Sequence, residues 1–207
     1  MRELVIVGAG GFARETAAAA EPAWQVLGFV DDDPALTGLT RSGRPILGPV
    51  DSVAAMEAAV VVCVGNPRNY GARRQIVERL GLPVERYATV VHPSVSIGAG
   101  SEVGPGTVLL AGTVLTADVT VGAHVAVMPQ AVLTHDDRVA DYATIASGVR
   151  LGGGVVLDSG AYVGAGALIR EGVKVGAGSL IGMGSVVLRD VPPEEIWAGS
   201  PARRLRS

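Results

Sequence analysis

The sequence predicts a small α/β Rossmann-like domain over residues 1–86, followed over residues 87–207 by a parallel β-helix built from hexapeptide repeats. Three observations support this fold class. Apolar strands alternate with helical segments over the first 80 residues. From Ile97 to Val187, every sixth residue is Ile, Val or Leu without a slip. Glycine is abundant, at 29 of 207 residues, whereas aromatic residues make up only 4%, as expected of a chain rich in tight turns.

The N-terminal part reads as strands alternating with helices, which predicts a small parallel sheet. The expected strands are Leu4–Val7, Gln25–Val30 and Val60–Val64, and the expected helices are Arg14–Ala20, Ser52–Ala59 and Tyr70–Leu80. A further strand, Tyr87–Val91, leads into the repeats.

Three loops of this domain follow the carboxyl ends of predicted strands, where open α/β sheets bind ligands. They contain, in turn, Gly10, Gly11 and Phe12; Asp31 and Asp32; and Gly65. Backbone N–H groups at a helix start can contact a phosphate, and acids about 20 residues later can contact a ribose or base. The alternative is a tight turn without a ligand. About 85 residues is half a dinucleotide-binding fold, so we expect one nucleotide rather than NAD.

The six-residue period fits neither a helix nor a single strand, but it fits short strands joined by tight turns. Three hexads make one triangular coil, so residues 18 apart lie above one another. Three residues after each aliphatic position the repeat prefers glycine, which adopts a left-handed turn without strain. Five neighbouring positions of this column hold larger side chains instead: Asp118, His124, Gln130, Asp136 and Tyr142. We expect these residues to form one glycine-poor patch that marks a functional site.

Within this segment, His135 is the candidate catalytic base. It lies two residues after the inward Leu133 and is expected to face outward at a corner, between Ala117 below and Gly153 above. These small neighbours leave room for a substrate and an acyl chain. Asp136 can turn back to the imidazole, fix its tautomer and raise its basicity. One alternative is that His135 is a solvated histidine without a role. His124 is a weaker candidate for a catalytic or substrate-binding role.

Asp137 is unusual because it occupies an inward column otherwise built of small residues. It is either paired with a partner or placed at the edge of the prism.

Composition excludes several classes of protein. The net charge of -3 and the absence of a basic run argue against a nucleic-acid or membrane-surface partner. The single cysteine, Cys63, forms no internal disulfide and offers no zinc cluster, and its apolar surroundings predict a buried residue. No signal peptide or membrane span is evident, which predicts a soluble cytoplasmic protein.

The whole chain resembles the left-handed β-helix acyltransferases. More narrowly, it is similar to the branch with bacterial sialic acid O-acetyltransferases and UDP-4-amino-sugar N-acetyltransferases. The segments that carry the resemblance are Val5–Glu15, Gly65-Asn66-Pro67, His92-Pro93-Ser94, Thr134-His135-Asp136 and Gly199-Ser200-Pro201-Ala202.

The resemblance implies a homotrimer with active sites between neighbouring β-helices. His135 would be the general base and Asp136 would orient it. A UDP-sugar would be held by Gly10, Gly11, Phe12, Asp31, Asp32 and Gly65. Acetyl-CoA would run along the β-helix past Thr144, Gly153 and Ala165, largely through backbone contacts. The chemistry needs no metal, since a thioester is already activated.

The chain departs from the family pattern at four positions. Met128 replaces a frequent Asn, Asp137 a frequent Cys, Thr144 a common His, and Phe12 a His of some members. The departures at Met128 and Thr144 affect acceptor identity and placement of the acyl group, and the departure at Phe12 affects contacts with the base or phosphate. We predict an acetyl-CoA-dependent N-acetyltransferase acting on a nucleotide-linked amino sugar. The alternatives are O-acetylation of a sugar such as sialic acid, and a non-catalytic solenoid that binds a nucleotide sugar.

Overall fold

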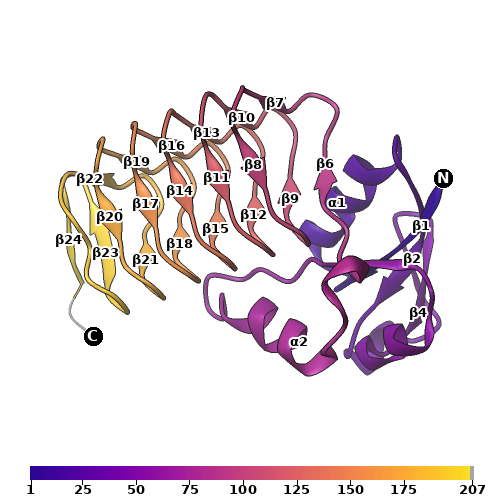
Figure 1. Ribbon diagram of the computed structural model, residues 1–207. Coiled ribbons are helices and arrows are strands. Elements are labelled where there is room, and N and C mark those ends of the chain that lie inside the picture. Colours follow the sequence, from indigo (N-terminus) through magenta and orange to yellow (C-terminus); the bar gives the residue numbers. More distant parts are fainter. Residues whose placement is uncertain (206–207) are drawn as a thin grey trace.

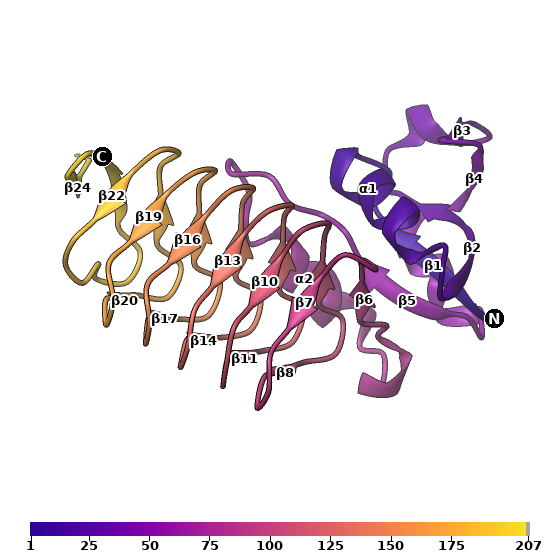
Figure 2. The same cartoon turned by 90° about the horizontal axis from the view of Figure 1, so that it is seen from above.

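A computed structural model describes residues 1–205 and contains both expected parts of the chain. An α/β domain lies at one end and along one flank of a long three-sided β-helix (Figure 1). Viewed from above, the coils of the β-helix follow one another in a straight row away from the α/β domain (Figure 2). None of the helices in residues 1–205 has the length and apolar character needed to cross a membrane.

The N-terminal domain contains a five-stranded sheet in the order β3-β4-β2-β1-β5. Its strands are β1 (Arg2–Val7), β2 (Trp24–Val30), β3 (Thr40–Arg41), β4 (Arg44–Gly48) and β5 (Ala59–Val62). The helices are α1 (Gly11–Ala20), α2 (Ala72–Leu80) and the short 3₁₀ segments η1 (Pro34–Leu36), η2 (Val50–Ala55) and η3 (Val84–Arg86). Strands β2, β1 and β5 are parallel, as predicted.

One local prediction for this domain is wrong, and one element was not predicted. The expected helix Ser52–Ala59 is instead the 3₁₀ segment η2, which ends at Ala55. Ala58 and Ala59, which follow it, are buried at the edge of the sheet. The hairpin of β3 and β4 was not predicted. Its turn uses Ser42 and Gly43, both with positive φ, of 47° and 75°. Such a turn matches the twist of a hairpin, but Ser-Gly is a weaker signal for it than Asn-Gly.

The β-helix has three parallel sheets. The first sheet contains β7 (Ser96–Ile97), β10 (Val114–Leu115), β13 (Val132–Leu133), β16 (Arg150–Leu151), β19 (Leu168–Ile169) and β22 (Val186–Val187). The second contains β8 (Glu102–Val103), β11 (Thr120–Val121), β14 (Arg138–Val139), β17 (Val156–Leu157) and β20 (Lys174–Val175). The third contains β6 (Val90–Val91), β9 (Val108–Leu109), β12 (Ala126–Val127), β15 (Thr144–Ile145), β18 (Tyr162–Val163), β21 (Leu180–Ile181), β23 (Ile196–Gly199) and β24 (Ala202–Arg204).

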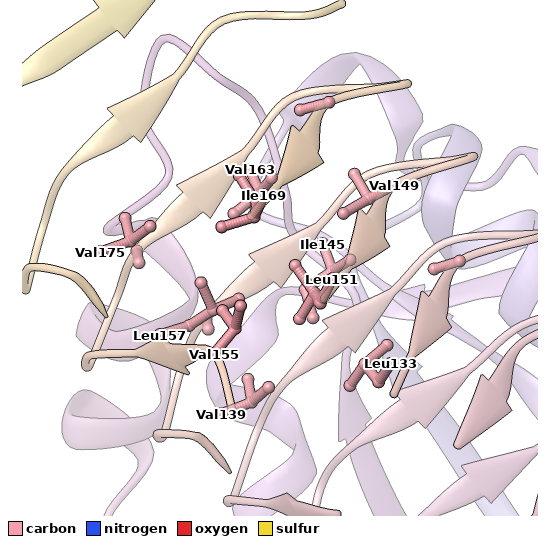
Figure 3. Close-up of a cluster of buried hydrophobic side chains, with 14 of the residues drawn as sticks. Leu133, Val139, Ile145, Val149, Leu151, Val155, Leu157, Val163, Ile169 and Val175 are labelled. Atoms are coloured by element: carbon pink, nitrogen blue, oxygen red, sulfur yellow. The ribbon is translucent and has the colours of Figure 1, made fainter. Parts of the chain in front are cut away.

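Residues 18 apart pair in register, as the repeat predicts; for example, Val114 pairs with Val132 and Val132 with Arg150. The Ile, Val and Leu residues at every sixth position fill the interior of the prism (Figure 3). Its first member, Ile97, is 45% exposed because no coil lies beneath it. At the other end, the hairpin of β23 and β24 closes the prism, with Trp197 buried against the last coil. The predicted C-terminal cap extends to Ser207, and its last two residues lie outside the described part of the chain.

Each coil turns at three corners, where the chain passes from the first sheet to the second, from the second to the third, and from the third to the first. We call these the first, second and third corners. The five larger residues of the glycine column do adopt left-handed backbone conformations, with φ between 53° and 64°. Successive hexads, however, lie on different sides of the prism. Asp118 and Asp136 lie at the first corner, His124 and Tyr142 at the second, and Gln130 at the third, so the prediction of one patch is wrong.

The α/β domain packs against the third sheet. Small residues of α1, among them Ala13 and Ala17, share an apolar core with Val108 and Leu110. Met128 packs against the same core. Helix α2 lies alongside the third sheet further along the prism (Figure 1). The two parts of the chain are therefore joined by buried contacts.

Candidate functional site

The three loops predicted to bind a nucleotide do converge. Residues 8–12, Asp31 and residues 63–66 line one cavity of about 230 Å³ at the carboxyl ends of β1, β2 and β5. Gly8 has a φ of 97°, and a Cβ on it would lie 3.0 Å from the carbonyl oxygen of Cys63, so the close approach of the loops requires glycine there. Gly10 and Gly11 have open space where a side chain would stand.

The two predicted acids of the second loop have different surroundings. Asp31 lines the cavity, and its carboxylate accepts hydrogen bonds from the N–H groups of Ala9, at 2.8 Å, and Asp33, at 3.0 Å. Asp32 does not line the cavity. Its carboxylate accepts from the Val50 N–H at 2.9 Å and from Arg79 at 2.7 Å, and the Arg79 bond holds the pKa of Asp32 below its usual value. Asp31 therefore shapes the glycine loop, while Asp32 fastens the neighbouring loop to α2.

His135 and Asp136 form a hydrogen-bonded pair at the first corner. The His135 Nδ1 lies 2.8 Å from Asp136 Oδ2, and each side chain is 68% exposed. The hydrogen bond that His135 donates to Asp136 raises the pKa of His135. Because Nδ1 is engaged with the carboxylate, Nε2 is the nitrogen left for a substrate. A Cβ on Gly153 would lie only 2.5 Å from this Nε2, so the ring rests directly against the glycine of the next coil.

Asp137 is paired, which settles the alternative left open by the sequence. Its side chain is completely buried, and it accepts hydrogen bonds from the N–H groups of Thr134 and Val155, both at 2.8 Å. Burial raises the pKa of the Asp137 carboxyl to about 7. This carboxyl group thus ties the turn that carries His135 to the next coil.

A larger cavity, of about 530 Å³, lies on the second sheet beside Asp136. Its charged lining consists of Asp118, Asp136, Arg138, Asp141 and Asp158. Among residues 1–205, no cluster of three or more His, Cys, Asp or Glu side chains is arranged to hold a metal ion.

His124 lies in a different environment, buried at the second corner. It stacks on Tyr142 at 5.2 Å between ring centroids and meets Tyr87 edge-on at 4.6 Å. Burial, together with the nearby Arg73, lowers the pKa of His124 to about 4. A buried, neutral imidazole cannot reach a substrate, so His124 is part of the contact between the two domains.

The three predicted acetyl-CoA contacts lie at different places around the prism, two at corners and one on a sheet. Gly153 adjoins His135 at the first corner, whereas Ala165 lies at the third corner. Thr144 is 3% exposed on the third sheet, and its Oγ1 accepts a hydrogen bond from Arg73 at 2.9 Å. The Thr144 side chain is therefore committed to the domain contact. Arg73 was not singled out from the sequence, since it lies in the ordinary helical run Ala72–Leu80 beside a second arginine.

Comparison with known proteins identifies both parts of the chain. A family model described as the PglD N-terminal domain matches residues 3–80. The acetyltransferase domain of PglB from Neisseria gonorrhoeae FA1090, in complex with acetyl coenzyme A, is 30% identical; the match covers 99% of each chain, with a TM-score of 0.88. Comparison with curated protein sequences gives no match.

Two further structures match along the full length. A variant of the perosamine N-acetyltransferase from Caulobacter crescentus, in complex with CoA and GDP-perosamine, is 25% identical over 100% of this chain and 98% of its own, with a TM-score of 0.89. WeeI from Acinetobacter baumannii AYE is 27% identical over 99% of this chain and 100% of its own, with a TM-score of 0.85. These matches confirm the predicted fold class and the predicted resemblance. The chain belongs to the acetyl-CoA-dependent acetyltransferases that join a PglD N-terminal domain to a left-handed β-helix.

Proposed function

We propose that this enzyme transfers the acetyl group of acetyl-CoA to the amine of a nucleotide-linked amino sugar, with His135 as general base. The observation that carries this assignment is the hydrogen-bonded pair of His135 and Asp136, exposed at a corner against Gly153. The choice of substrates is supported by the relatives, one bound to acetyl-CoA and another to CoA and GDP-perosamine.

The geometry suggests how the proton moves. Asp136 holds the proton on Nδ1, so the Nε2 lone pair accepts a proton from the sugar amine as the amine nitrogen attacks the thioester carbonyl. A C–N bond forms, the C–S bond breaks, and the CoA thiolate takes up the proton from Nε2 to leave as the thiol, so that His135 becomes neutral again. The raised pKa of His135 makes it a stronger base than a free histidine.

The acceptor nucleotide would occupy the cavity lined by Gly10, Gly11, Phe12, Asp31 and Gly65. This cavity shares no residue with the cavity beside Asp136. Gly153 follows β16 at the first corner and Ala165 precedes β19 at the third corner, so the two lie at opposite ends of neighbouring strands of the first sheet. Both can contact one acetyl-CoA molecule if the first corner of one copy faces the third corner of another. We therefore infer a homotrimer with its sites between copies, located in the cytoplasm, where acetyl-CoA is available.

The test is an acetyl-transfer assay with UDP- and GDP-linked amino sugars, in which thiol release and product mass are measured. We expect transfer by the wild type and at least a 10²-fold loss in His135→Asn. His92→Asn is the matched control, because the side chain of His92 forms hydrogen bonds only with Ser94 in its own turn. An alkali-labile ester product would favour the O-acetyltransferase. Undiminished turnover in His135→Asn would refute its role, and absence of CoA binding would favour a scaffold protein.

A further inference from the structure

Arg73, at the start of α2, is the most fully buried charged side chain of the contact between the two domains, with 1% exposure. Its guanidinium donates to five oxygen atoms: Val64 O at 3.1 Å, His124 O at 2.7 Å, Tyr142 O at 2.9 Å, Ala143 O at 3.0 Å and Thr144 Oγ1 at 2.9 Å. All five acceptors are uncharged, and within residues 1–205 Arg73 forms no salt bridge. Burial lowers the pKa of the guanidinium to about 10, so it stays protonated at neutral pH.

The acceptors come from two places that concern the reaction. Val64 belongs to the third loop of the nucleotide cavity, next to Gly65. His124 and Tyr142 lie 18 residues apart at the second corner, and the coil that runs from one to the other carries His135. One side chain thus connects the nucleotide loop to both ends of the coil that bears the reacting histidine.

Stability alone does not explain a buried guanidinium here. A buried charge is costly to desolvate, and apolar replacements of buried charges are often at least as stable. The two domains already share an apolar core formed by α1 and the third sheet. A role in placing the nucleotide loop accounts for the retained charge.

The direction of one peptide group indicates what this role is. The peptide between Val64 and Gly65 is trans, since the only cis peptide bond in the described chain precedes Pro201. In a trans peptide, the C=O and N–H groups point in opposite directions. Arg73 holds the Val64 carbonyl, so the Gly65 N–H is directed away from the guanidinium, and Gly65 is one of the residues that line the cavity. This N–H finds no hydrogen-bond acceptor within residues 1–205.

We propose that Arg73 is a positioning residue that turns the Val64–Gly65 peptide so that the Gly65 N–H donates to an oxygen of the nucleoside diphosphate, and that fixes this loop on the coil bearing His135. The inference rests on the proposed function for the identity of the ligand. It assigns Arg73 no contact with either substrate.

The test measures binding of UDP and GDP to the intact protein by calorimetry, beside steady-state kinetics. In Arg73→Met we expect the Kd of the preferred nucleotide and the KM of the nucleotide sugar to rise about tenfold, the equivalent of one hydrogen bond to a charged acceptor. The KM of acetyl-CoA should stay within about twofold of the wild-type value. Tyr70→Phe is the matched control, because it removes another hydrogen bond between the domains, from Tyr70 to Gly178 O, without touching the nucleotide loop.

Gly65→Pro provides a second test, since it removes the N–H and leaves Arg73 in place. We expect the same loss of nucleotide affinity, and no further loss in the double variant. If Arg73→Met fails to fold, Gly65→Pro still tests the part of the inference that concerns the Gly65 N–H, and unchanged nucleotide affinity in this variant overturns it. Unchanged nucleotide affinity in a folded variant, equal increases in both KM values, or a wild-type protein that binds neither nucleotide would overturn the inference. Intact nucleotide binding without acetyl transfer would instead refute the proposed function alone.

Discussion

The buried carboxyl of Asp137 predicts a specific pH dependence of stability. Its pKa is about 7 in the folded protein, whereas an unfolded aspartate titrates near pH 3.9. Between these values the unfolded chain releases a proton that the native state retains, so the free energy of unfolding falls as the pH rises and levels off above pH 7. At about 1.4 kcal/mol per pKa unit, the loss between pH 5 and pH 8 is about 2 to 3 kcal/mol.

The informative variant is Asp137→Ser, because serine already occupies this column of the repeat. Ser101 accepts the N–H of Val119, one coil later, at 3.1 Å, so a serine at 137 can keep the equivalent bond to Val155. The bond from Thr134 would be lost. We expect the unfolding temperature of the variant to rise relative to the wild type by about 4 to 12 °C between pH 5 and pH 8.

The measurement is thermal unfolding at several pH values and one protein concentration, with Asp118→Asn as control. Asp118 lies at the same corner, but it is exposed. Removal of its charge should leave the pH dependence of the wild type intact. A constant difference between wild type and Asp137→Ser from pH 5 to pH 8 would refute the reasoning.

Three further predictions concern the site itself. A Cβ in Gly153→Val would lie 2.4 Å from Cε1 of His135, so the ring must move; we expect kcat to fall about 10²-fold with little change in unfolding temperature, and a wild-type kcat would count against this placement. Asp136→Asn should lower the pKa of His135, so that the rising limb of the kcat/KM profile moves to lower pH while its plateau falls by about one to two orders of magnitude. If the rising limb stayed at the same pH, Asp136 would not be the residue that raises the pKa of the base. A Cβ on Gly10 meets no atom within 4 Å, so Gly10→Val should fold, but we expect the KM of the nucleotide sugar to rise about tenfold and that of acetyl-CoA to stay unchanged.

The sequence predicted the architecture well because its repeat is determined by local geometry. Each hexad supplies one short strand and one corner, so the repeat by itself places the aliphatic residues in the interior of the prism. The convergence of the glycine loop, Asp31 and Gly65 followed in the same way from the parallel sheet. The pairing of His135 with Asp136 required only adjacent residues at a turn.

What the sequence did not show depends on contacts between distant segments. Arg73 meets carbonyl groups about 50 and 70 residues away, and no local pattern encodes such contacts. The same docking buries Thr144 and His124, which the repeat alone leaves at the surface. Asp32 binds Arg79 of α2 and therefore has a different role from Asp31. The position of α2 could not be predicted from the sequence.

The triangular coil also limits how the length of this protein can change. A chain lengthened or shortened by one hexapeptide before His135 would still fold its strands, but every later residue would be rotated by a third of a turn. The imidazole would then emerge on a different side of the prism. Only insertions or deletions of three hexapeptides keep the phase, so the distance between the two substrates can be adjusted only in steps of one whole coil.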